Sequence, residues 1–144
     1  NVVPNRAVLT VDLRNTREES LRTAEARLQA HLAALRDAEK VQITTRSLAR
    51  FEPVPFAPEM TALVERHARK HGLSTRRMPS GAGHDAQMLA AVCPSAMIFV
   101  PSVDGISHNV QEFTHPHHIE AGANVLLSVL CELAGATGPA GVHS

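Results

Sequence analysis

Two histidines lie in loops on either side of one strongly apolar segment. His84 follows the glycine-rich turn at residues 80–83 (SGAG), and His108 follows residues 104–107 (DGIS). An imidazole can donate a hydrogen bond to a developing oxyanion or ligate a divalent metal ion. Loops held by a rigid scaffold are the usual location of such groups. His84 and His108 are therefore the first candidate site residues.

The chain has nine histidines, and the others lack such a setting. Three of them lie inside predicted helices without a ligand-spaced partner: His31, His67 and His71. His143 lies near the C-terminus. The remaining three, His115, His117 and His118, cluster at the start of the last predicted helix. There we expect adventitious nickel or zinc binding rather than a function.

Four segments have the apolar pattern of β-strands. Residues 96–102 (AMIFVPS) form a continuous apolar run, which is typical of a strand buried on both faces. Residues 7–14 alternate apolar and polar side chains, and residues 41–51 begin with the same alternation. A shorter strand is expected at residues 73–78.

Four segments are predicted to be helical. The first, residues 16–38, carries a Thr16/Glu19 capping box and a leucine-rich stripe. The second runs from Pro58 to about residue 71, and the third spans residues 85–92. The last runs from residue 116 to about 133 and carries recurring apolar residues: Ile119, Ala123, Leu126, Leu127 and Leu130.

The order of these elements predicts an α/β protein in two parts. Residues 1–52 read as strand, long helix and strand, and the three prolines of residues 53–58 predict a linker. Residues 59–134 would form the second part, and residues 135–144 a frayed tail.

Composition excludes several classes of protein. Lys plus Arg and Asp plus Glu number 14 each, and the chain has four Phe with no Trp or Tyr, which argues against nucleic-acid and membrane-surface binding. No apolar run approaches the ~18 residues of a membrane span. Cys93 and Cys131 lack metal-type spacing and are interpreted as buried or half-buried free thiols, compatible with a cytoplasmic location.

Three motifs in order resemble the hydantoinase/carbamoylase family of dinuclear-metal amidohydrolases. They are residues 80–86 (SGAGHDA), 98–102 (IFVPS) and 104–108 (DGISH), with residues 1–4 (NVVP) and 11–14 (VDLR) extending the likeness. The family includes N-carbamoyl-L-amino-acid hydrolase, beta-alanine synthase and allantoate amidohydrolase. The resemblance covers nearly the whole chain.

The resemblance implies a fold. Residues 1–52 correspond to the second half of an inserted α/β sandwich lid domain, through which such enzymes dimerise. Residues 59–134 correspond to the C-terminal segment of a zinc-peptidase-like three-layer α/β/α catalytic domain. The expected partners are therefore a second copy of the chain and the N-terminal half of the same enzyme, which would precede Asn1.

The resemblance also implies site residues. Asn1 and Arg14 would bind the substrate carboxylate, and Gly83 and His84 would contact the substrate, with His84 stabilising charge in the transition state. His108 would ligate one of two divalent metal ions, either zinc or manganese, cobalt or nickel. The other ligands and the general base would lie outside this segment. Glu112 would at most support His108.

The activity implied is hydrolysis of the linear C–N bond of an N-carbamoyl-L-amino acid or related ureido acid. One alternative is allantoate or an N-acyl amino acid as substrate, because the carboxylate-binding residues would be shared. Another is a non-catalytic fragment that acts only in dimerisation. Alone, the segment is expected to be inactive, because one histidine does not hold a catalytic metal pair.

Overall fold

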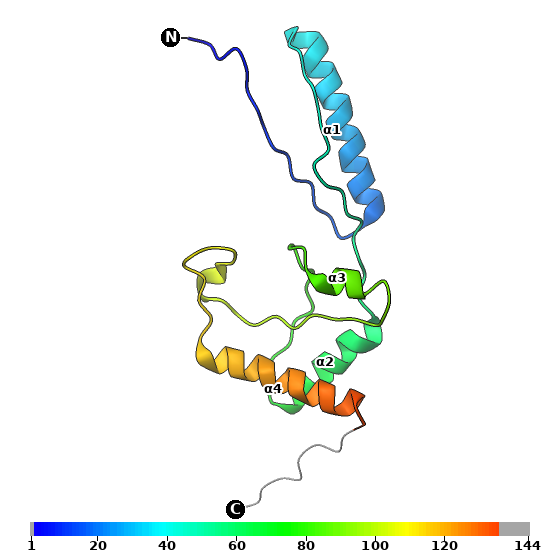
Figure 1. The fold of residues 1–144 in the computed structure, drawn as a ribbon, viewed down its shortest axis with the longest axis vertical. Coiled ribbons are helices and arrows are strands. Elements are labelled where there is room, and N and C mark those ends of the chain that lie inside the picture. The colour runs from blue at the N-terminus through cyan, green and yellow to red at the C-terminus, as the bar shows by residue number, and fades with distance from the viewer. Residues whose placement is uncertain (1, 136–144) are drawn as a thin grey trace, which may run out of the picture. The chain divides into compact units, whose positions relative to one another are not determined.

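The computed structural model describes residues 2–135, and the chain separates into two compact units (Figure 1). Unit 1 is Asn1–Val54 and unit 2 is Pro55–Ser144. The division lies inside residues 53–58, where the prolines predict a linker. The assignment of the two parts to a lid domain and a catalytic domain stays a prediction.

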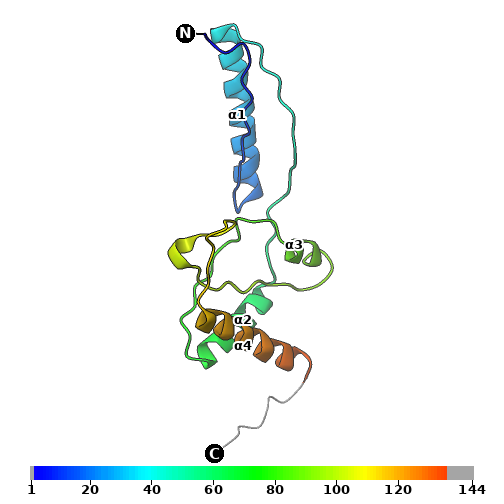
Figure 2. The ribbon, with the colours of Figure 1, turned by 60° about the vertical axis from the view of Figure 1, so that its left-hand side comes forward.

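Unit 1 is built on α1, Glu18–Glu39, a long helix that both views show running the length of this unit (Figures 1 and 2). Leu21 is buried and the rest of the expected leucine-rich stripe is half-buried, so the periodicity identified the less exposed face. The prediction of a Thr16/Glu19 capping box is wrong. The Asn15 side chain accepts the Arg17 N–H at 2.9 Å, and the helix begins only after Arg17.

The return segment after α1 is tied to the helix by ion pairs. Arg50 binds Glu18 at 2.6 Å and Glu25 at 3.1 Å, and Arg22 binds Glu18 at 2.6 Å and Glu52 at 3.2 Å. The hydrogen bond from Arg50 is the main reason that the pKa of Glu18 is lowered. These ion pairs connect residues 50–52 to α1, and among the described residues of this unit Leu21 is the one buried side chain.

Unit 2 is organised around the packing of α2, Pro58–Lys70, on α4, Pro116–Leu133. His67 of α2 is buried, and its Nε2 lies 2.8 Å from Glu132 Oε2. One helical turn along each helix, His71 Nε2 lies 2.9 Å from Ser128 Oγ. Because the residue number rises on α2 while it falls on α4, the two helices run antiparallel at this contact.

Removal of the Glu132 carboxylate should loosen this packing. Glu132→Ala leaves the buried His67 ring without its partner and removes the Glu132–Arg66 ion pair, so we expect a loss of about 1–2 kcal/mol in unfolding free energy. Thermal unfolding measures the change in melting temperature. Glu120→Ala, on the same helix, is the control. Equal melting temperatures for the two variants would contradict this account of the contact.

A second contact in unit 2 is unusually close. A Cβ atom added at Gly122 of α4 would lie 2.6 Å from Val100 Cγ1, so the absence of a side chain lets the segment 96–102 lie directly on the helix. Val125 and Val129 of the same helix are 2% and 4% exposed. The core of unit 2 therefore lies along the Gly122–Val129 face of α4.

The α4 helix also carries apolar residues outside this core. The side chains of Ile119, Leu126, Leu127 and Leu130 are all exposed. The helix is apolar on more than one face, and the buried Val125 and Val129 lie on the same face as Gly122, which meets Val100. Periodicity alone could not decide between two apolar faces.

The predicted strands are extended but unpaired. Residues 7–14, 41–51, 73–78 and 96–102 contain no β-strand, and no β-ladder occurs among residues 2–135. Alternation selects an extended backbone, but a strand also requires a neighbour for its N–H and C=O groups. The α/β architecture and its lid sandwich are therefore not seen in the secondary structure of the described part.

The helix bounds and the two cysteines agree with the sequence predictions only in part. The α2 and α4 bounds agree with the sequence patterns, whereas α3, Asp85–Leu89, ends before residue 92. Both cysteines are free, but Cys93 is exposed, so its predicted burial is wrong. Across residues 2–135 no helix has the length and apolar character needed to cross a membrane. The predicted tail lies outside the described residues from position 136 onward.

Candidate functional site

His84 is the N-cap residue of α3, a helix of five residues. Its backbone is extended, and its Nδ1 accepts the Ala86 N–H at 3.0 Å. The preceding turn is fixed by Ser80, whose hydroxyl donates to the Ala82 carbonyl at 3.0 Å. The His84 ring is thus held by Nδ1 on an exposed turn, where Nε2 is not engaged by any described residue.

The glycines of this turn have no left-handed backbone. Neither Gly81 nor Gly83 has a positive φ. A Cβ at Gly83 would meet only Gln87 Oε1 at 3.8 Å, an ordinary contact. Among the described residues, the Asp85 carboxylate forms no hydrogen bond with His84, because a backbone amide already occupies the nitrogen that it would have oriented.

His108 lies in a closed loop between residues 102 and 113. The neck of the loop is formed by Val103 N–H donating to the Phe113 carbonyl at 2.8 Å, and by Ser102 Oγ donating to the Ile106 carbonyl at 2.7 Å. His108 itself has φ +57, a left-handed conformation that is uncommon for a residue with a side chain. Strained backbone of this kind is concentrated at functional sites.

Glu112 supports this conformation. Its Oε2 accepts the His108 backbone N–H at 2.9 Å, so the carboxylate fixes the loop and leaves the imidazole exposed. A neutral imidazole suits zinc and similar divalent ions. No group of three His, Cys, Asp or Glu side chains within residues 2–135 is arranged to hold a metal. His108 fits a metal site by chemistry but supplies one ligand.

Arg14 belongs to unit 1 and pairs with a neighbouring carboxylate. Its Nη2 lies 2.5 Å from Asp12 Oδ2, and its Nε donates to the same carboxylate at 3.0 and 3.1 Å. This hydrogen bond lowers the pKa of Asp12 and raises the pKa of Arg14. The guanidinium therefore already presents its planar fork to a carboxylate, the geometry expected for a carboxylate-binding arginine. Asn1 lies outside the described residues.

The structure places the site residues in two groups. Gly83, His84 and His108 belong to unit 2, on the two loops that precede and follow the extended segment 96–102, and Arg14 belongs to unit 1. No hydrogen bond or ion pair joins His84 to His108 within the described part of the chain. Their roles as catalytic, substrate-binding and metal-binding residues stay predictions.

The His115/His117/His118 cluster is compact. The His117 and His118 ring centroids lie 4.0 Å apart, His115 stacks on His117 at 5.6 Å, and the Phe113 ring meets His115 edge-on at 5.3 Å. Burial, followed by repulsion from His117 and His115, lowers the pKa of His118. The first turn of α4 also carries no acidic residue to stabilise these charges.

Acid should therefore loosen the start of α4. Because the pKa of His118 is lower in the folded state than its ordinary value of 6.5, the fold binds this proton less readily than the unfolded chain does. Protonation of His118 therefore does not change the free energy of unfolding above about pH 6.5, and it lowers this free energy as the pH falls below that value. His118→Gln should flatten this decline in melting temperature, whereas His31→Gln should not. Parallel pH curves for all three proteins would contradict the prediction.

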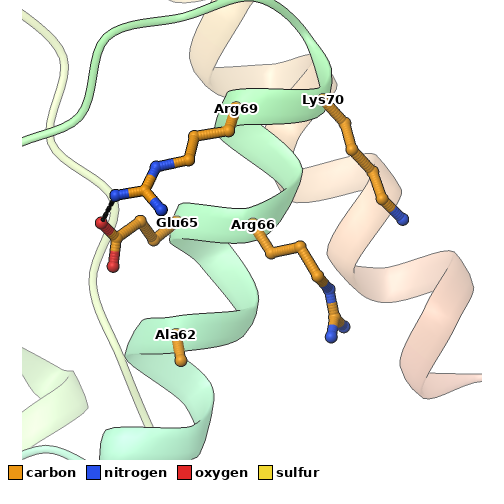
Figure 3. Close-up of a pocket in the computed structure, with 5 residues that line it drawn as sticks. All are labelled: Ala62, Glu65, Arg66, Arg69 and Lys70. Carbon is orange, nitrogen blue, oxygen red and sulfur yellow. Dashed lines mark hydrogen bonds and ion pairs between the residues drawn. The ribbon is translucent and has the colours of Figure 1, made fainter.

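A shallow depression of about 480 Å³ lies along α2 (Figure 3). Its rim carries Arg66, Arg69 and Lys70, and Glu65 pairs with Arg69 and also with Arg77. Arg66 is likewise paired with Glu132. Much of its positive charge is thus neutralised, and the depression contains no predicted site residue.

Comparison with known proteins decides the family. Residues 4–132 match Peptidase family M20/M25/M40. The chain belongs to this family. Two relatives are an Escherichia coli allantoate amidohydrolase and a Rhizobium meliloti N-carbamoyl-L-amino-acid amidohydrolase, each 37% identical over 134 residues. These alignments cover 93% of this chain but 33% and 32% of the two enzymes, so the chain spans about a third of their length.

A solved structure shows the same likeness. A hydantoinase/carbamoylase family amidase from Burkholderia vietnamiensis superposes with a TM-score of 0.73 at 38% identity, over 87% of this chain and 30% of that protein. The resemblance inferred from the sequence motifs is therefore confirmed, for a segment of such enzymes.

Two side chains, Gln87 and Glu112, accept hydrogen bonds from the backbone of the candidate histidines. Glu112 accepts a hydrogen bond from the His108 backbone N–H, and its expected supporting role at a metal site stays a prediction. Gln87 was not predicted, although its Oε1 accepts the His84 backbone N–H at 3.2 Å. The signal for it was present, because a glutamine three residues after an N-cap is the capping-box spacing.

Proposed function

We propose that the protein containing this chain hydrolyses the linear C–N bond of N-carbamoyl-L-amino acids or related ureido acids. The observation that carries the proposal is the equal similarity to an allantoate amidohydrolase and an N-carbamoyl-L-amino-acid amidohydrolase over 134 residues. Both named substrates are ureido acids with a carboxylate. The chain would supply the residues that bind such a substrate.

Arg14 would bind the substrate carboxylate together with Asn1. In the structure the Arg14 fork holds the Asp12 carboxylate in a bidentate manner, which supports its suitability for this role. A substrate carboxylate would share or displace this contact. Gly83, which has no side chain beside His84, would leave room for the ureido group.

His84 would act on the reacting carbonyl. Water adds to the carbamoyl carbon, the bond from that carbon to the amino-acid nitrogen breaks, and the nitrogen leaves as the protonated amine. The released carbamate yields ammonia and carbon dioxide. Donation from His84 to the carbonyl oxygen would stabilise the negative charge that develops there.

His108 would provide one imidazole ligand to a divalent metal centre, zinc or else manganese, cobalt or nickel, completed by ligands elsewhere in a longer protein. When bound, such a metal pair lowers the pKa of its water and so supplies the attacking hydroxide. The Glu112 contact would keep the His108 loop in the required conformation.

The exposed apolar surfaces support a longer protein as the working form. Leu126, Leu127 and Leu130 of α4 are exposed, as are Val8 and Leu9 of an extended segment without a partner strand. Apolar faces and unpaired extended segments are normally covered in a working protein. We infer that a preceding catalytic half covers unit 2 and that unit 1 takes part in a homodimer of a cytoplasmic enzyme.

An N-acyl amino acid is the second candidate substrate, because the carboxylate-binding residues would be the same. The Arg14→Ala variant of the protein at its natural length tests whether the substrate has a carboxylate that Arg14 binds. We expect KM for an N-carbamoyl-L-amino acid to rise roughly 10- to 100-fold, since a charged hydrogen bond is worth about 1.5–3 kcal/mol. Arg36→Ala is the control. An unchanged KM would contradict carboxylate binding by Arg14, and a preference for N-acyl substrates would favour the second candidate.

A further inference from the structure

The imidazole of His84 is held through one particular nitrogen. Its Nδ1 accepts the Ala86 backbone N–H at 3.0 Å, and a nitrogen that accepts a hydrogen bond carries no proton. In the neutral ring the proton must therefore lie on Nε2. The other tautomer would place two N–H groups against each other at this position.

Gln87 fixes the backbone that makes this contact possible. Its Oε1 accepts the His84 N–H at 3.2 Å, and its own N–H donates to the His84 carbonyl at 2.9 Å. Gln87 is half-buried, and the neighbouring Ala86 is only 7% exposed, so this end of α3 is anchored in unit 2. The His84 main chain is thus bound on both sides by one residue.

We propose that Gln87 is a positioning residue that holds His84 as the Nε2–H tautomer, with this N–H presented to the oxygen of a ureido carbonyl. The proposal rests on the function proposed above, because it assigns the donor atom within that site. Only the Nε2–H tautomer can donate from the exposed edge of the ring, since Nδ1 faces the helix. Gln87 would not touch the substrate.

A backbone amide at His84 Nδ1 selects a different tautomer from the one that the adjacent Asp85 carboxylate would select. A carboxylate at Nδ1 would accept a hydrogen bond and so select the Nδ1–H tautomer, leaving Nε2 as an acceptor. The Ala86 N–H selects the opposite tautomer. Within residues 2–135 no hydrogen bond from the ring to Asp85 competes with this selection.

The test is the tautomer of His84, measured by long-range ¹H–¹⁵N correlation NMR at a pH where the ring is neutral. The wild-type protein should show the Nε2–H form. Gln87→Leu, which is similar in size but has no acceptor, should give a mixture of tautomers. Gln87→Glu keeps an acceptor oxygen at the capping-box position and should restore the Nε2–H form. Gln29→Leu on α1 is the control and should behave as wild type.

Kinetics provide the second readout with the protein at its natural length. Gln87→Leu should lower kcat about 10-fold with little change in KM, and Gln87→Glu should recover most of it. An Nδ1–H ring in the wild type, or identical tautomers in wild type and Gln87→Leu, would overturn the proposal. Because the NMR readout needs no substrate, an inactive protein with an Nε2–H ring would refute the proposed function alone.

Discussion

His84→Ala should lower kcat/KM for N-carbamoyl-L-amino acids by roughly 100- to 1,000-fold, the effect of deleting one oxyanion-hole donor. The side chain is exposed, and its Nδ1 accepts a hydrogen bond from the first turn of a five-residue helix. Loss of activity should therefore greatly exceed any loss of stability. Steady-state kinetics with thermal unfolding of the same samples measures both.

Two controls separate this role from general disturbance of the protein. His31→Ala removes an exposed histidine from α1 and should leave the kinetics unchanged. His84→Asn keeps a short N-cap side chain, so it should preserve stability while losing activity. If His84→Ala retained more than about a tenth of the wild-type kcat/KM, donation from this ring could not carry the charge stabilisation assigned to it.

Gly122→Ala should destabilise the protein by about 1–3 kcal/mol, the usual cost of overpacking. The added Cβ would lie 2.6 Å from Val100 Cγ1, well inside van der Waals contact. Alanine is the better helix former by about 1 kcal/mol, so the clash must exceed that gain for the sign to hold. Chemical denaturation of the wild type and the variant measures the difference.

A double-mutant cycle assigns the cause. Val100→Ala removes the methyl groups that meet the new Cβ, so Gly122→Ala in that background should be neutral or stabilising. Gly81→Ala, at a position where a Cβ would meet nothing within 4 Å, is the control and should have little effect. Equal costs of Gly122→Ala in both backgrounds would show that Val100 is not the obstacle.

The helices could be predicted from sequence because their signals are local. Pro58 and Pro116 begin α2 and α4, and the leucine-rich stripe marks the less exposed face of α1. Features that depend on a contact between distant residues could not be predicted in this way. The core face of α4 depends on the approach of Val100 to Gly122, which no periodicity records.

The candidate site divides in the same way. His84 and His108 could be selected from sequence because each follows a glycine-containing loop motif. Their geometry could not, since the hydrogen bond from Ala86 to Nδ1 and the left-handed φ of His108 depend on the folded loops. The predicted strands failed for a related reason, because alternation in residues 7–14 says nothing about which chain supplies a partner.

Ammonia release from N-carbamoyl-L-amino acids by the metal-loaded protein at its natural length tests the central claim most directly. The account predicts one ammonia per ureido group cleaved, a loss of turnover in His84→Ala, and a large preference for substrates with a free carboxylate over their amides. Absence of ammonia release from every ureido and N-acyl amino acid tested, with metal bound and the protein folded, would contradict it.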